Sequence, residues 1–144
     1  MKKLLGSFLL SLFITSTTLA QLISADPAFP TENDQVIITF NSSLGSGGLA
    51  GFTGDVYAHT GVITSNSSSG SDWKYVKAGW NENIPECKMT MIGDDLWELT
   101  IGPSIKEYYG VPANETILQM AFVFRSADGS LEGKTEDGGD IFYD

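Results

Sequence analysis

The sequence has very few of the residues that build catalytic and metal sites. Its 144 residues include a single histidine, His59, and a single cysteine, Cys87. A zinc centre needs several His or Cys ligands. A Ser-His-Asp triad would depend on His59, and the chain has no G-x-S-x-G motif. We therefore expect no catalytic residue, no metal site and no cofactor, and we expect Cys87 to be a small buried side chain.

Basic residues are also scarce. The chain has eight Lys and Arg residues and 18 Asp and Glu residues, which gives a formal net charge of −10 at pH 7. Such a chain is repelled by nucleic acids and by anionic membrane surfaces, so neither is an expected partner. Acidic surfaces mostly serve solubility, and the charge alone indicates no particular ligand.

The one long apolar run lies at the N-terminus. Two lysines precede residues 4–14, and small and polar residues lead from there to Ala20. This pattern is typical of a secretory signal peptide, and the run is shorter than the about 20 apolar residues that span a bilayer. We predict that residues 1–20 are a signal peptide cleaved after Ala20. The mature protein is then secreted, periplasmic or on the cell surface, without membrane insertion.

Helical patterns are almost absent from the rest of the chain. Residues 21–35 form a polar, proline-bearing lead-in, and residues 36–144 form one domain with a helical turn from Ser104 to Tyr109. Alternating apolar residues and turn signals predict about seven strands. They are expected at residues 36–40, 56–60, 72–76 and 117–129, on both sides of a turn at 93–95, and at 141–143. The predicted fold class is all-β, an immunoglobulin-like antiparallel β-sandwich.

Aromatic residues gather around a loop that is too polar to form a core. Alternation within residues 56–60 places Tyr57 and His59 together on the face opposite the core, and Trp73 and Trp80 follow a Ser-rich loop. Aromatic rings beside polar loops often bind a ligand, and a pyranose ring is a suitable one. Lys74 would supply a polar group for hydrogen bonds to the sugar hydroxyls. The alternative is that these rings belong to the core, as most Trp and Tyr side chains do.

Another tryptophan fits that alternative better. Trp97 alternates with apolar neighbours inside the expected hairpin around residues 93–95. We therefore expect Trp97 to be a core residue.

Three segments together resemble a known family: GDVYAHTG, KMTMIGDDLWELTIGP and LQMAFVFRSADG. They look like the starch-binding β-sandwich modules of carbohydrate-binding families 25 and 26. The chain is also similar to the N-terminal domain of secreted α-amylase-type proteins of Bacteroidetes. The resemblance implies non-catalytic binding of starch or maltooligosaccharides by aromatic stacking, as an accessory module of an extracellular starch-degrading system.

The resemblance also implies which residues bind the sugar. Tyr57 and His59 match the strand positions of the family's aromatic platform, and Trp73 matches the tryptophan that follows. Trp80 competes with Trp73 for that place, because the intervening loop is long. The polar contacts of the last loop would come from near Lys134 and Asp137.

Other functions stay open at this stage. The resembling domain normally precedes a family 13 glycoside hydrolase barrel of about 250 residues, and 144 residues cannot hold one. We therefore expect no hydrolysis by this polypeptide, with such a catalytic domain as a possible partner. The domain could instead pack structurally against that barrel, with its aromatic residues buried. A carboxylate-pair enzyme and a protein-binding module are further alternatives.

Calcium is a separate question for the loop of residues 128–140. The loop has spaced acidic residues but lacks the EF-hand pattern. We favour a solvated acidic loop there.

Overall fold

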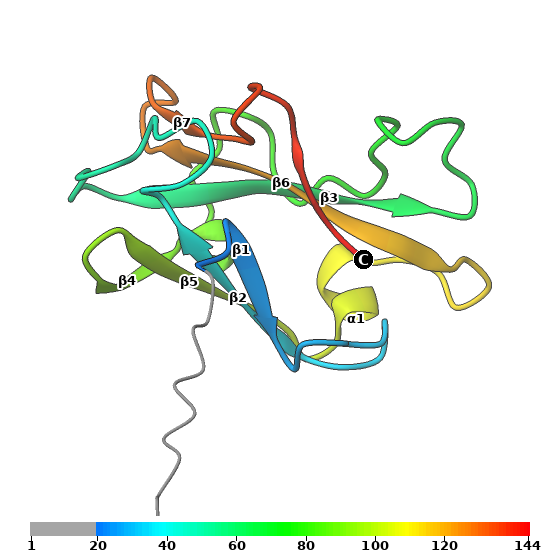
Figure 1. Cartoon of the computed structure of the whole chain (residues 1–144). Coiled ribbons are helices and arrows are strands. Elements are labelled where there is room, and N and C mark those ends of the chain that lie inside the picture. Colours follow the sequence, from blue (N-terminus) through cyan, green and yellow to red (C-terminus); the bar gives the residue numbers. More distant parts are fainter. Residues whose placement is uncertain (1–19) are drawn as a thin grey trace, which may run out of the picture.

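The chain folds into two antiparallel β-sheets that lie face to face (Figure 1). The structure, a computed structural model, describes residues 20–144, so the predicted signal peptide lies outside the described residues apart from Ala20. The first sheet has the strand order β1-β2-β5-β4. Its strands are β1 (Ile23–Asp26), β2 (Val36–Asn41), β5 (Leu96–Ile101) and β4 (Thr90–Gly93).

The second sheet is built around its longest strand. Strand β6 (Ile117–Ser126) pairs with β3 (Val56–Thr64) on one edge. On its other edge it pairs with β7 (Glu132–Gly133) and β8 (Ile141–Tyr143). In chain order this is the A-B-E-D and C-F-G arrangement of an immunoglobulin-like sandwich. The predicted fold class is confirmed, and so is the central position of residues 117–126.

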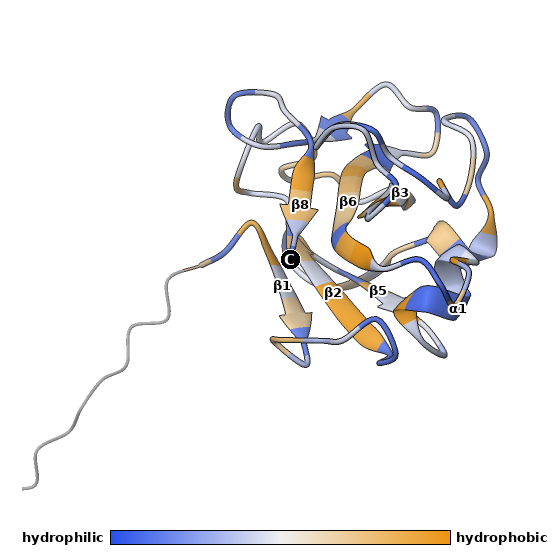
Figure 2. Ribbon diagram, turned by 90° about the vertical axis from the view of Figure 1, so that its right-hand side faces the viewer, coloured by the Kyte–Doolittle hydropathy of each residue, from blue (hydrophilic) through white to orange (hydrophobic). Residues whose placement is uncertain are grey.

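The core lies between the sheets: β2 and β5 bury alternate residues there, whereas β3 and β6 are buried along most of their length. Val36, Ile38 and Phe40 of β2 are fully buried, and the Phe40 ring stacks on Phe124 of β6 with ring centroids 4.0 Å apart. Trp97 is 3% exposed. Hydrophobic colouring is strong on β2, β6 and β8, whereas the connecting loops are mostly hydrophilic (Figure 2). The prediction that Trp97 is a core residue is confirmed, and Cys87 is buried as expected.

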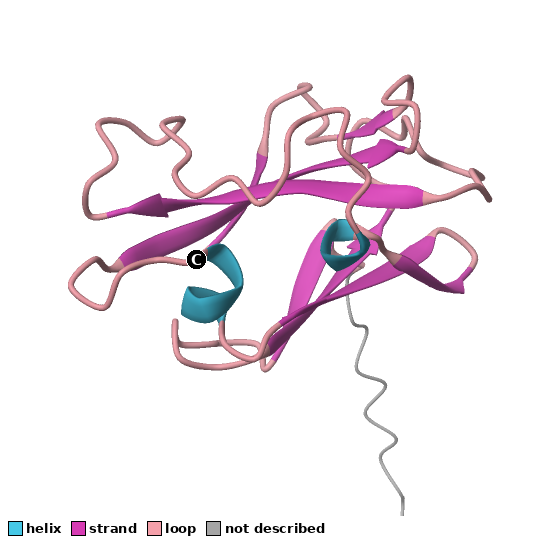
Figure 3. Cartoon of the chain, turned by 180° about the vertical axis from the view of Figure 1, so that it is seen from behind, coloured by secondary structure: helices cyan, strands magenta, loops and turns pink. Residues whose placement is uncertain are grey.

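Two short-range predictions also hold. The β4–β5 hairpin turns at Asp94 and Asp95. The helical turn is α1 (Ile105–Tyr109), where the Ser104 side chain accepts a hydrogen bond from the Glu107 amide. Figure 3 shows this helix together with the short 3-10 helix η1 (Pro85–Cys87) against the strands. Among the described residues, no helix is long and apolar enough to cross a membrane.

Two predictions about strands were wrong. Residues 72–76 form no strand: they touch β3 through the isolated Val62–Lys74 bridge, and the positive φ of 49° at Tyr75 interrupts the extended chain. The lead-in of residues 21–35 contains β1, whose Ile23 pairs with Phe40. This strand has only four residues, and its pairing with β2 is not visible in the local pattern. Within residues 20–144, the sandwich therefore has eight strands.

The glycine-rich loop of residues 43–54 packs its backbone directly against the segment after β7. A Cβ atom on Gly45 would lie 2.1 Å from the Lys134 carbonyl oxygen, and one on Gly48 would lie 2.2 Å from that of Glu132. The Ser46 amide donates to the Lys134 carbonyl at 2.9 Å. The glycines thus allow the loop to fix the backbone of Lys134, which lines the site described next.

Candidate functional site

A depression of about 340 Å³ lies on the outer face of the sheet formed by β3 and β6. Residues from β3, from β6 and from the loops around them form its wall. Four of the lining residues are ones that the sequence analysis had singled out: His59, Trp73, Trp80 and Lys134. Four others were missed: Ser71, Val76, Val123 and Asp140. The structure therefore brings together most of the predicted aromatic residues at one open site.

His59, Trp73 and Trp80 form an aromatic cluster along this depression. The His59 ring stacks on Trp73 with centroids 5.7 Å apart and an interplanar angle of 25°. Trp80 meets His59 edge-on, at 5.1 Å and 73°. All three side chains are half-buried, so each ring packs on a neighbour and still presents surface to solvent. The cluster combines a fixed geometry with an accessible apolar surface.

His59 is held as a neutral ring. Burial lowers its pKa from the ordinary value of 6.5, and the positive charge of Arg125 lowers it further. The buried Nδ1 of His59 and the buried Nε1 of Trp73 have no hydrogen-bond partner among the described residues. Ring packing, rather than hydrogen bonding by these two nitrogens, holds the two side chains together.

Arg125 supports Trp80 from within the fold. This side chain of β6 is only 2% exposed, and its guanidinium lies 5.8 Å from the Trp80 ring centroid and 5.4 Å from that of Tyr57. It donates hydrogen bonds to Asn83 Oδ1 and to the Glu82 carbonyl, both at 2.9 Å. Arg125 thus ties the segment that carries Trp80 to β6. A lone cation within the apolar run of β6 was the sequence signal for this role, and the sequence analysis did not use it.

The structure does not place three of the predicted site residues in the depression. Tyr57 shares the outer face with His59 as expected, but it is only 8% exposed, and the Arg125 guanidinium lies over its ring. The Lys74 ammonium is paired with Asp72 at 3.0 Å. Asp137 accepts a hydrogen bond from Thr135 within its own turn. Lys134 does line the depression, with its ammonium 2.6 Å from a carboxylate oxygen of Glu132.

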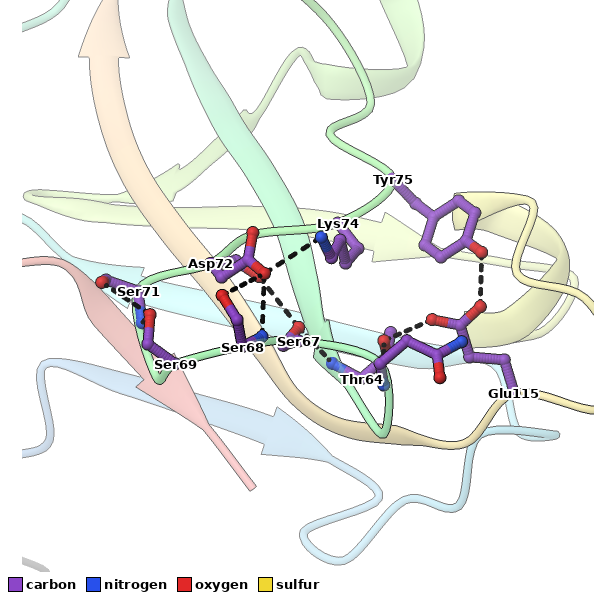
Figure 4. Close-up of polar contacts among 10 residues, drawn as sticks. Thr64, Ser67, Ser68, Ser69, Ser71, Asp72, Lys74, Tyr75 and Glu115 are labelled. Carbon is purple, nitrogen blue, oxygen red and sulfur yellow. Dashed lines mark hydrogen bonds and ion pairs between the residues drawn. The ribbon is translucent and has the colours of Figure 1, made fainter.

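The Ser-rich loop of residues 65–72, which leads to Trp73, is an ordered hydrogen-bonded unit (Figure 4). The carboxylate of Asp72 accepts from the Ser68 amide at 2.8 Å and from the Ser68 hydroxyl at 2.9 Å. Ser67 donates to the Asp72 carbonyl at 2.8 Å. The two Ser68 bonds and the Lys74 ammonium lower the pKa of Asp72 to about 2. The loop therefore fixes the residue that directly precedes Trp73.

A second set of hydrogen bonds fixes the chain just after Trp73. The Glu115 carboxylate accepts hydrogen bonds from the hydroxyl of Thr64 and from that of Tyr75, the latter at 2.5 Å (Figure 4). Both hydroxyls lower the pKa of Glu115, because they stabilise its charged form. Trp73 thus lies between two fixed points, Asp72 and Tyr75, and reaches the depression from a preorganised backbone.

Among residues 20–144, no group of three or more His, Cys, Asp or Glu side chains is placed to hold a metal ion. In the acidic loop of residues 128–140, Asp128 accepts hydrogen bonds from Ser126 and Ser130, and Asp137 from Thr135. These carboxylates stabilise turns within the loop.

Comparison with known proteins gives a family without an assigned function. A family model described as "Domain of unknown function (DUF8578)" matches residues 23–132. No curated protein matches the chain. The matched region contains the aromatic cluster and Arg125, whereas Lys134 and Asp140 lie just beyond it. Because the match covers well over half of the sequence, the chain belongs to the DUF8578 family.

Proposed function

We propose that this domain binds α-glucan, as starch or maltooligosaccharides, without catalysis. The observation that carries the proposal is the aromatic cluster of His59, Trp73 and Trp80 along an open depression with polar side chains at its wall. The apolar C–H face of a glucose ring packs on an indole, and its hydroxyls hydrogen-bond to polar neighbours. Aromatic stacking contributes about 0.5–1.5 kcal/mol per pair beyond the area buried.

The orientation of the rings favours a curved chain over a flat one. Trp73 is nearly parallel to His59, at 25°, whereas Trp80 is steeply inclined to it, at 73°. The two indoles therefore do not form a flat platform. A β-1,4-linked chain such as cellulose is flat and suits coplanar rings. An α-1,4-linked chain curves, so successive glucose rings can meet differently inclined aromatic faces.

The proposed role is that of an accessory module in an extracellular starch-degrading system. A shallow site with few stacking rings gives weak affinity on its own. Linkage to a catalytic domain, such as a family 13 glycoside hydrolase, or to other binding modules would raise the effective concentration of the substrate.

A pull-down on insoluble starch tests this proposal. The mature domain is incubated with starch, with cellulose as the control solid, and maltoheptaose is added as a soluble competitor. We expect retention on starch, release by maltoheptaose and no retention on cellulose. A folded domain that is not retained on starch would contradict the proposal and favour a structural domain that packs against a catalytic barrel.

A further inference from the structure

Asp140 is the acidic side chain of the depression that the rest of the fold leaves unused. It lines the depression and is half-buried, yet it makes no hydrogen bond or ion pair with any residue in the described part of the chain. Two other carboxylates near it are engaged: Asp137 by Thr135, and Glu132 of β7 by Lys134. The carboxylate of Asp140 therefore keeps its full capacity to accept hydrogen bonds.

The backbone of Asp140 is held next to a strand ladder. Ile141, the first residue of β8, pairs with Phe122 of β6. The preceding residue, Asp140, thus enters the sheet next to Val123, and Val123 pairs with His59. Asp140 therefore lines the depression from a position that directly precedes a paired strand, and such a fixed backbone supports an effective binding group.

Of the residues that the structure describes, no basic side chain around the depression forms an ion pair with Asp140. The ammonium of Lys134 is already paired with Glu132. Arg125 is buried, and carbonyl and amide oxygens accept its hydrogen bonds. A carboxylate in this setting accepts strong, charge-assisted hydrogen bonds from hydroxyl donors, and it repels a ligand that carries a carboxylate or sulfate.

We propose that Asp140 binds the hydroxyls of the ligand directly and makes the site selective for uncharged sugars. This inference rests on the proposed glucan binding and adds the residue that decides which class of sugar is accepted. Asp137, which the sequence analysis named as a site residue, lies in the same loop, and its carboxylate accepts hydrogen bonds within its own turn.

The test compares Asp140→Asn with Asp137→Asn and the unsubstituted protein. Asn keeps the shape of Asp and removes the charge, and Asp137→Asn is the matched control in the same loop. Isothermal titration calorimetry measures binding of two probes: maltoheptaose, and maltoheptaose whose primary hydroxyls have been oxidised to carboxylates. Thermal unfolding shows whether each variant is folded.

We expect Asp140→Asn to bind maltoheptaose about tenfold more weakly, because a charged hydrogen bond is exchanged for a neutral one. The preference for the uncharged probe should shrink in this variant, and Asp137→Asn should behave like the unsubstituted protein. Unchanged maltoheptaose affinity or a fully retained preference in Asp140→Asn overturns the inference and leaves glucan binding standing. Failure of the unsubstituted protein to bind maltoheptaose overturns both.

Discussion

The three tryptophans take different roles because of what lies on each side of their rings. Trp97 is 3% exposed in the core between the sheets, whereas Trp73 is half-buried, stacks on His59 and lines the depression. Trp80 has Arg125 behind it and His59 at its edge. Trp73 and Trp80 are thus complementary parts of one site, although the sequence presents them as rivals.

Trp73 and Trp97 give a direct test of this assignment. Trp73→Ala should weaken starch retention by about tenfold or more, since it removes a stacking face, and should cost little stability. Trp97→Ala should lower the free energy of unfolding by about 3–5 kcal/mol, as truncation of core aromatics does. Starch retention and urea unfolding of both variants measure these effects. The opposite pattern, with Trp73→Ala unfolding the domain, would show that the roles are reversed.

The pKa of His59 provides a second test at this scale. Burial and the Arg125 charge lower it below 6.5, so the folded state binds this proton less readily than the unfolded chain. Its contribution to stability is therefore complete above the unfolded pKa and is lost as the pH falls through the folded pKa. NMR titration of the imidazole should give a midpoint below 6.5. A midpoint at or above this value would mean that the ring is solvated and not packed as described.

At the scale of elements, the Ser-rich loop of residues 65–72 orders the site although its composition suggests flexibility. Its serines bond to Asp72, and Glu115 holds Tyr75 on the other side of Trp73. Because the loop is already ordered before the ligand binds, binding costs less conformational entropy and the affinity is higher.

Asp72→Asn tests the loop. The bonds to Asp72 require its charged form, so they should persist above the pKa of about 2 and be lost as the pH falls through it. The substitution weakens these bonds at every pH and should lower maltoheptaose affinity severalfold by freeing Trp73. Calorimetry measures the affinity, with Asp94→Asn in the exposed β4–β5 turn as the control. Equal affinity in the two variants would mean that the loop does not position Trp73.

Elements with a strong local pattern could be predicted from the sequence. The β-branched segment of residues 36–40, the helical turn that begins at Ser104 and the Asp94–Asp95 turn each reflect short-range physics, and all three are present. Strand β1 could not be found this way, because its four residues depend on pairing with β2. The segment of residues 72–76 has strand-like residues, but the turn at Tyr75 overrides their propensity.

The candidate site also combines features that have a local sequence pattern with features that have none. Alternation correctly put Tyr57 and His59 on one face, but it does not show that Arg125 lies over the ring of Tyr57, which is buried. The choice between Asp137 and Asp140 depends on which carboxylate the turn itself uses. Such contacts between distant residues have no local sequence signal.

At the scale of the whole molecule, the net charge of the protein does not determine which ligand the proposed site binds. The protein has a formal net charge of −10, yet the proposed ligand is neutral, and stacking and short hydrogen bonds would hold it. Screening by salt acts mainly on interactions between charges at a distance. Starch retention should therefore stay unchanged between about 0.05 and 0.5 M NaCl. The same acidic surface should keep the domain off duplex DNA and anionic vesicles even at the lowest salt concentration. Pull-downs on starch across the salt series, with DNA and vesicle sedimentation in parallel, measure both effects. Retention that falls steeply with salt would show that long-range attraction between charges, and not the aromatic cluster, holds the ligand.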